Sequence, residues 1–169
     1  MMRPVAYLKK TDCLGFTLLE LTLVMFFMAI IAGLSTPFVM STLDRMELQT
    51  SARKVASALR YARSEAIASK RPVVFSGNLD RNQFWVNQGY NNETPKIISL
   101  TGPIRLDHFI NEGEDNFVRD DEFTVTFFPQ GNSSGGLIGM NINESRNSEN
   151  YYAISIDPIT GKTKIKQSK

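Results

Sequence analysis

Hydrophobic residues follow three different patterns along the chain, and these patterns divide it into successive segments. Residues 16–40 are almost entirely apolar, and Glu20 is the only ionisable residue among these 25 positions. At about 1.5 Å of rise per residue, this segment forms a helix of roughly 38 Å, longer than the ~30 Å hydrocarbon core of a bilayer. A cleaved secretory signal has a shorter apolar run of about 7–15 residues. We therefore expect residues 16–40 to be a retained transmembrane helix.

The helix is expected to continue past residue 40, because apolar residues then recur on one helical face. The recurring residues are separated by steps of 4, 3, 4, 3 and 4: Leu48, Ala52, Val55, Leu59, Ala62 and Ala66. Pro72 predicts an end near Lys70 or Arg71, since the residue before a proline disfavours helical dihedrals. Residues 41–71 are thus an amphipathic half-helix whose apolar face needs a sheet to cover it.

From residue 72 the pattern changes to short alternating runs bounded by turn residues. The clearest alternation places Phe123, Val125 and Phe127 on one side of a strand. The expected strands are 73–76, 83–86, 97–100, 104–109, 122–128, 137–142, 151–156 and 162–166, and the polar stretches 89–95, 111–121 and 143–150 are expected loops. The predicted fold class is α+β, with one long N-terminal helix packed on an antiparallel β-domain of about seven or eight strands over residues 72–169.

Glu20 is the exception within the apolar segment. A carboxylate inside a membrane helix costs on the order of 2.5–3.5 kcal/mol, so it is expected to have a partner. No lysine or arginine lies within helical reach on the apolar side. Glu20 either stays hydrated near the membrane surface or pairs with a cation from another molecule at the same depth. A free α-amino group at Phe16, made by cleavage after Gly15, would be such a cation.

The net positive charge of the chain lies in its first 15 residues. The whole chain has a net charge of +2, and residues 1–15 hold three positive and one negative side chain: Arg3, Lys9, Lys10 and Asp12. Residues 16–169 are therefore close to neutral. The positive charges favour a cytoplasmic leader and an extracytoplasmic C-terminal part. Cys13 is the only cysteine, so no disulfide or cysteine-based metal site is expected after the leader.

The residues Gly15-Phe16-Thr17-Leu18-Leu19-Glu20 at the head of the apolar helix resemble the processing and methylation motif of type IV pilins and type II secretion pseudopilins. The resemblance implies that a prepilin peptidase cuts between Gly15 and Phe16, removes residues 1–15, and methylates the new Phe16 amine. It also implies that Glu20 pairs with the amine of a neighbouring subunit when the helix moves from lipid into a filament core. Pro37 falls where such helices carry a kink-forming proline.

Three later passages are similar to GspH/FimT-type minor pseudopilins: 59–66 (LRYARSEA), 127–136 (FFPQGNSSGG) and 152–162 (YAISIDPITGK). This resemblance implies a non-enzymatic subunit at or near the tip of the periplasmic pseudopilus of a type II secretion system, helping to drive protein export. It implies a single-pass protein of the bacterial inner membrane with a periplasmic C-terminal domain. Its implied partners are the prepilin peptidase, other major and minor pseudopilins, the inner-membrane assembly platform, and membrane lipid before assembly.

Two related interpretations stay open at this point. The chain could be a minor pilin of a type IV pilus, and such a pilin could serve DNA uptake. Lys162, Lys164 and Lys166 alternate, so a strand would place all three on one face, where they could contact phosphates. The same pattern protects an edge strand against aggregation. Because residues 16–169 are nearly neutral, nucleic acid is not expected as a partner.

No catalytic, cofactor-binding or metal site is expected. His108 is the only histidine and has no cysteine or nucleophile elbow to join it, so a surface or strand-end position is expected. The glycines of 127–136 favour a tight turn, because a phosphate-binding loop would need a lysine and a following helix. The acidic run over 112–122 lacks the ligand spacing of a calcium loop, which favours a solvated loop. An enzyme merely anchored by the helix would retain activity in a fragment starting near Ser41, and no residues suggest a reaction.

Overall fold

The computed structural model describes residues 15–87, 94–113, 117–118, 121–142 and 151–167, with the side chains of 34–41 and Phe117 outside the described part. One continuous helix, α1, covers Leu18–Ser69 (52 residues). The chain forms two compact units, Met1–Met40 and Ser41–Lys169, and α1 contributes its first part to one and its second part to the other. The side chain of Pro37 and residues 1–14 of the expected leader lie outside the described part.

The first unit, as far as it is described, consists of the N-terminal part of α1 and the residues just before it. Its apolar side chains are exposed, as at Leu18 (82%), Met25 (69%) and Ile31 (64%). Among the residues that the structure describes, no helix combines the length and apolarity needed to cross a membrane.

The second part of α1 ends as the sequence predicts. Ser69 is the last helical residue, and Lys70 follows with a φ of 55°, the left-handed conformation that commonly closes a helix. Pro72 cannot continue the helix, and the chain enters the first strand at Val73.

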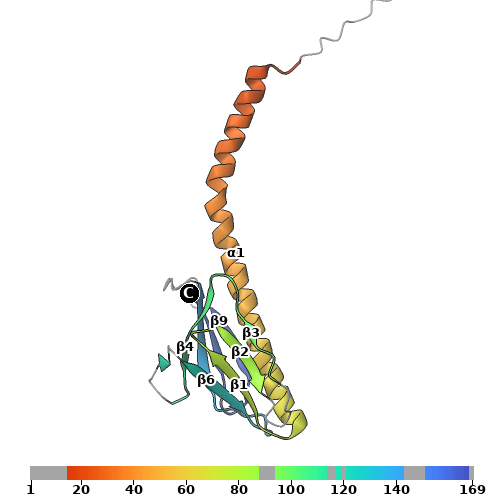
Figure 1. The fold of residues 1–169 in the computed structure, drawn as a ribbon, viewed down its shortest axis with the longest axis vertical. Helices are drawn as coiled ribbons and strands as arrows, with labels where there is room; N and C mark the ends of the chain where they lie inside the picture. Colours follow the sequence, from red (N-terminus) through yellow and green to blue (C-terminus); the bar gives the residue numbers. More distant parts are fainter. Residues whose placement is uncertain (1–14, 88–93, 114–116, 119–120, 143–150, 168–169) are drawn as a thin grey trace, which may run out of the picture. The chain divides into compact units, whose positions relative to one another are not determined.

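The second unit contains two antiparallel sheets (Figure 1). The four-stranded sheet has the order β3-β2-β1-β6, and the five-stranded sheet has the order β5-β4-β7-β8-β9. The strands are β1 (Val73–Asn78), β2 (Gln83–Asn87), β3 (Ile98–Ser99), β4 (Ile104–Ile110), β5 (Phe117–Val118), β6 (Glu122–Phe127), β7 (Gly136–Ile142), β8 (Tyr151–Ile156) and β9 (Thr163–Gln167).

The strand predictions are confirmed with small changes. Seven of the described strands have five or more residues, and β3 and β5 have two each. The predicted loop 111–121 contains the short strand β5, because Phe117 and Val118 pair with the end of β4. The expected strand at 97–100 shortens to Ile98–Ser99, and the last strand begins at Thr163, one residue after Lys162.

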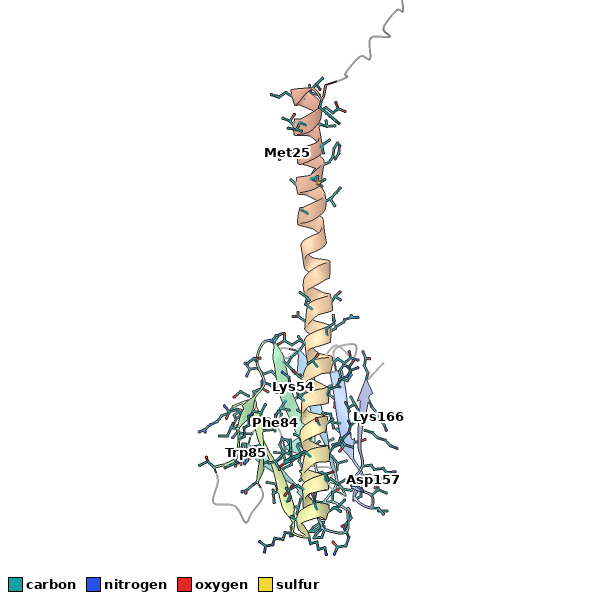
Figure 2. The ribbon with its side chains drawn as sticks, turned by 90° about the vertical axis from the view of Figure 1, so that its right-hand side faces the viewer. Met25, Lys54, Phe84, Trp85, Asp157 and Lys166 are labelled. Atoms are coloured by element: carbon teal, nitrogen blue, oxygen red, sulfur yellow. The ribbon has the colours of Figure 1, made fainter. Side chains whose placement is uncertain are left out.

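The core lies between the two sheets and the second part of α1. Every residue of the predicted helical face is buried to 1% exposure or less, and Ala56 joins that face. The predicted alternation in β6 is also confirmed, with Phe123, Val125 and Phe127 all buried. The ring of Phe123 stacks on that of Phe109 from the other sheet, with centroids 4.5 Å apart. Figure 2 shows the second part of α1 lying across both sheets, with Trp85 of β2 on one side and Lys166 of β9 on the other.

Candidate functional site

The start of α1 is a capped helix terminus. Thr17 directly precedes the first helical residue, and its Oγ1 accepts a hydrogen bond from the Glu20 N–H at 3.2 Å. Thr17 is thus the N-cap, and Glu20 lies in the first turn, where the helix dipole favours a negative charge. The capping role of Thr17 is missing from the sequence-based expectations, although the Thr-x-x-Glu spacing is the usual sequence signal of such a cap.

The three residues of the predicted processing and assembly site are all accessible. Gly15 and Phe16 precede the helix, Phe16 is 82% exposed, and a Cβ added at Gly15 would meet no atom within 4 Å. Glu20 is also exposed. Residues 1–14 lie outside the described part, so cleavage after Gly15 and methylation of Phe16 stay predictions.

The three later passages that carry the family resemblance meet at one side chain, Arg63 of α1. Its Nε–H donates to the carbonyl oxygens of Gly131 (3.1 Å) and Thr160 (3.0 Å). Gly131 belongs to the glycine-rich passage after β6, and Thr160 to the turn between β8 and β9. One guanidinium therefore joins residues 68 and 97 positions away from it. We call this contact the Arg63 junction.

The backbone at the junction needs its glycines. Gly131 and Gly161 have φ values of 88° and 61°, which other residues rarely adopt. A Cβ at Gly161 would collide with the carbonyl oxygen of Gly131, so the two turns can approach closely only with glycine there. The glycines of this passage therefore serve a structural turn, as predicted, and they also allow the two turns to pack closely.

The turn between β8 and β9 is held by Asp157. Its Oδ1 accepts hydrogen bonds from the backbone N–H groups of Ile159 (3.0 Å) and Thr160 (2.8 Å) and from the Thr160 hydroxyl (3.0 Å). The bonds from Thr160 hold the pKa of Asp157 below its usual value. Ser133 links this turn to the glycine-rich passage, because its Oγ donates to the Asp157 carbonyl at 3.1 Å.

The three lysines considered for DNA contact lie along one edge of the five-stranded sheet. Lys164 and Lys166 are exposed on β9, and Lys162 is exposed just before it. Thr163 and Ile165 between them are half-buried, which is the alternation of a strand with one face toward the core. Because β9 is the edge strand, the lysines stand where charged residues prevent edge-to-edge association. This arrangement does not test whether the three lysines contact nucleic acid.

The prediction for His108 is wrong. The side chain lies within β4 and is only 8% exposed. A bulge between Leu106 and His108 shifts the register by one residue, so Leu106 and Phe109 both face the core while His108 faces outward. On that outer face the imidazole packs over Gly139, where an added Cβ would lie 2.5 Å from its Cε1.

His108 belongs to a hydrogen-bonded cluster on three adjacent strands. Its Nδ1 lies 2.7 Å from Asp107 Oδ2, and its Nε2 lies 3.3 Å from the Tyr151 hydroxyl. Asn141 Nδ2 donates to the other Asp107 oxygen at 3.1 Å. Burial, and secondarily the Asp107 charge, raise the pKa of Tyr151. Both ring nitrogens of His108 are engaged within the cluster, so its evident role is to join β4, β7 and β8.

Within the described residues, no three or more histidine, cysteine or acidic side chains are grouped to hold a metal ion. Part of the acidic run, residues 114–116 and 119–120, lies outside them. The possibility that the acidic run over 112–122 binds calcium is therefore tested only for the residues of the run that the structure describes.

The family follows from a comparison with known proteins. The family model of Type II transport protein GspH matches residues 51–160, about two thirds of the chain, and this range includes Arg63, Gly131 and Thr160. The chain belongs to the GspH family. The predicted resemblance to GspH-type proteins is thus confirmed. GspH proteins are a structural, non-enzymatic family, membrane-anchored and periplasmic.

One relative agrees with this GspH assignment by sequence, and two solved structures share the fold. The type II secretion system protein H of Xanthomonas campestris pv. campestris is 26% identical over 152 residues, covering 89% of this chain and 81% of that protein. The minor pseudopilin EpsH from the type II secretion system of Vibrio cholerae superposes with a TM-score of 0.59 at 12% identity, over 74% of this chain and 99% of that one. The type IV minor pilin FimU of Pseudomonas aeruginosa superposes with a TM-score of 0.53 at 18% identity, over 73% of this chain and 96% of that one. The two structural likenesses establish the pilin-like fold.

Proposed function

We propose that this GspH-family chain is a minor pseudopilin of a type II secretion system, a non-enzymatic subunit at or near the tip of the periplasmic pseudopilus. The GspH match over residues 51–160 carries the proposal, and the Gly15–Glu20 motif independently supports a pilin-like subunit. The likeness to FimU shows only that this chain and a type IV minor pilin share the pilin fold. Both the family model and the Xanthomonas relative are named for type II transport, so a type IV pilus role is the weaker alternative.

The proposed mechanism begins at the N-terminus. Residues 16–40 anchor the precursor in the inner membrane with residues 1–15 in the cytoplasm, because only Glu20 interrupts their apolar sequence. A prepilin peptidase removes residues 1–15 and methylates Phe16. The exposed positions of Gly15 and Phe16 support access by such an enzyme.

Glu20 then selects the position of each subunit in the filament. Its carboxylate pairs with the Phe16 amine of a neighbouring subunit, and the pairing removes the cost of an uncompensated charge in an apolar surrounding. The assembly platform adds subunits in the membrane, and the β-domain makes lateral contacts with other pseudopilins. The growing filament helps to push folded proteins through the outer membrane.

The proposal is tested by deleting the gene in its native host and measuring exoprotein secretion, twitching and transformation in parallel. Secretion alone should be lost and should return with the wild-type gene. Glu20→Val should insert in the membrane yet fail to restore secretion, and mature wild-type protein should begin at a methylated Phe16 by mass spectrometry.

Thr17→Ala is the matched control for Glu20→Val. It removes the hydrogen bond from the Glu20 N–H to the Thr17 side chain but keeps the carboxylate, so it should restore most secretion if the charge acts between subunits. Full secretion with Glu20→Val, or an uncut leader, would contradict the proposed mechanism. Loss of twitching or transformation with normal secretion would move the protein to a type IV pilus.

A further inference from the structure

The Arg63 junction uses one of the three nitrogens of the Arg63 guanidinium, the Nε that donates to Gly131 and Thr160. Neither Nη1 nor Nη2 has a hydrogen-bond acceptor among the residues that the structure describes. Neither is among the buried side-chain atoms that lack a partner, so within the described part of the chain both reach solvent. We call these two terminal nitrogens the Arg63 fork.

The Arg63 fork is held in place before any ligand binds. Two carbonyl oxygens, from the glycine-rich passage and from the turn between β8 and β9, fix its Nε. That second turn is itself fixed, because Asp157 Oδ1 accepts hydrogen bonds from the N–H and the hydroxyl of Thr160. Figure 2 shows Asp157 beside the last turns of α1. A group that is already ordered loses little conformational entropy when it binds a ligand.

The charges close to the fork favour an anionic ligand. Arg60 lies one helical turn before Arg63, and Lys162 follows Gly161; both are exposed. Two acidic residues are near in sequence. Glu65 is two positions along the helix from Arg63, and residues at that spacing do not face each other. Asp157 points its Oδ1 at its own turn, so it leaves the fork open to an anion from another molecule.

Two exposed isoleucines lie next to the fork. Ile67, one turn after Arg63, is 42% exposed, and Ile159, which precedes Thr160, is 83% exposed. A Cβ added at Gly131 would lie 3.4 Å from Ile67 Cδ1 and 3.2 Å from Arg63 Nη2, so these two groups adjoin the same glycine. Large exposed apolar side chains next to an ordered arginine are typical of protein-binding surfaces.

We propose that the Arg63 fork binds an aspartate or glutamate side chain of a partner protein, in a segment whose neighbouring apolar residues pack on Ile67 and Ile159. The planar fork matches a carboxylate, which can accept from both terminal nitrogens. A free phosphate ion would also match the fork but would leave Ile159 uncovered, so a carboxylate in an apolar segment fits the site better. The inference goes beyond the proposed function and uses none of the residues at the start of α1.

Nuclear magnetic resonance of the full-length protein in detergent reports on this site. The Arg63 Nε–H and the backbone N–H groups of Gly131 and Gly161 surround the fork. We would titrate with acetyl-Leu-Glu-Leu-amide and expect saturable shifts of all three signals. The neutral isostere acetyl-Leu-Gln-Leu-amide should bind about fivefold more weakly, because an exposed ion pair contributes modestly. Added salt should weaken only the acidic peptide.

Substitutions of exposed isoleucines test the apolar part of the site. Ile159→Ser should weaken binding of the acidic peptide about fivefold, because the apolar area that the peptide covers is reduced. Ile97→Ser is the matched control. Ile97 is also exposed (57%) but precedes β3 of the other sheet, so affinity should change by less than about twofold. Circular dichroism checks that both variants are folded, which is expected for substitutions at exposed positions.

Arg63→Lys tests the fork itself, because it keeps the charge and removes the planar pair of donors. It should weaken the acidic peptide about fivefold and leave the neutral one unchanged. Because this variant also alters the junction, Ile159→Ser remains the test that does not depend on folding.

Absence of saturable shifts with the acidic peptide, or equal affinity for the two peptides, would overturn the proposal. Equal losses in Ile159→Ser and Ile97→Ser would also overturn it. Inorganic phosphate that binds as tightly as the acidic peptide, with no loss in Ile159→Ser for either ligand, would make the fork a site for small anions and overturn it as well. Each result leaves the secretion test of Glu20 unaffected, so failure of this inference and failure of the proposed function are distinguishable.

Discussion

At the level of single residues, several polar side chains have precise structural roles that composition does not reveal. Thr17 caps α1, Asp157 organises the turn between β8 and β9, and His108 fills the space above Gly139. Asp157 is the most instructive, because its carboxylate is exposed and yet accepts three hydrogen bonds. Its contribution to stability should therefore depend on its ionisation.

Asp157→Asn tests this dependence. Because the folded-state pKa of Asp157 is lowered from 3.8, the ionised side chain stabilises the fold above that pH, and the stabilisation is lost as the pH falls through the folded-state value. Wild type should melt at a higher temperature than the variant at pH 6, and the difference should shrink by at least about half by pH 3. Asp80→Asn, also exposed and in a turn, is the control for the loss of a surface carboxylate. A difference in melting temperature that stays constant from pH 6 to pH 3 would show that ionisation of Asp157 is not involved.

At the level of elements, the sequence predicts what depends on local periodicity and fails where contacts join distant segments. The helical face from Leu48 to Ala66 and the alternation in β6 are visible in the sequence because burial repeats every 3.6 or 2 residues. The bulge in β4 changes that period within one strand, so that Phe109 and not His108 continues the core face of Leu106. The sequence does contain a sign of this bulge, because Leu106 and Phe109 are three residues apart and would lie on opposite faces of a regular strand.

The Arg63 junction is a second feature that periodicity could not predict. The arginine lies on a polar part of the helix pattern, and its acceptors are backbone carbonyls of two separate turns. Family resemblance marks all three passages but gives no physical reason for them. The structure supplies that reason, since the passages meet in one contact.

Arg63→Lys tests the importance of this junction. Lysine keeps the charge but has no Nε–H group and no planar guanidinium. It therefore cannot donate to the carbonyl oxygens of Gly131 and Thr160 in the same geometry. We expect a loss of about 1–3 kcal/mol in the free energy of unfolding, measured by urea denaturation of the full-length protein. Arg60→Lys, on an exposed position of the same helix, should change it by less than about 0.5 kcal/mol. Equal effects of the two substitutions would mean that Arg63 acts only through its charge.

At the level of the whole molecule, the residues proposed for assembly and the buried core lie in different parts of the chain. Gly15, Phe16 and Glu20, the residues proposed for processing and assembly, belong to the first unit. All members of the buried hydrophobic cluster, as far as side chains are described, lie at Leu48 or later. This separation suits the proposed mechanism, in which the N-terminal helix moves from lipid to filament while the β-domain keeps its structure.

A fragment starting at Ser41 tests this separation. Because the described core begins at Leu48, the fragment should unfold cooperatively, and its free energy of unfolding should match that of the β-domain in the full-length chain within the ~10–15% uncertainty of extrapolation. Urea titration followed by Trp85 fluorescence reports on the β-domain in both proteins, since the chain has no other tryptophan. The substitution Leu59→Ala, applied to both, should lower each midpoint equally, because Leu59 is fully buried within the same cluster. A fragment that is unfolded, or destabilised by several kcal/mol, would instead show that residues before Ser41 contribute to the stability of the β-domain.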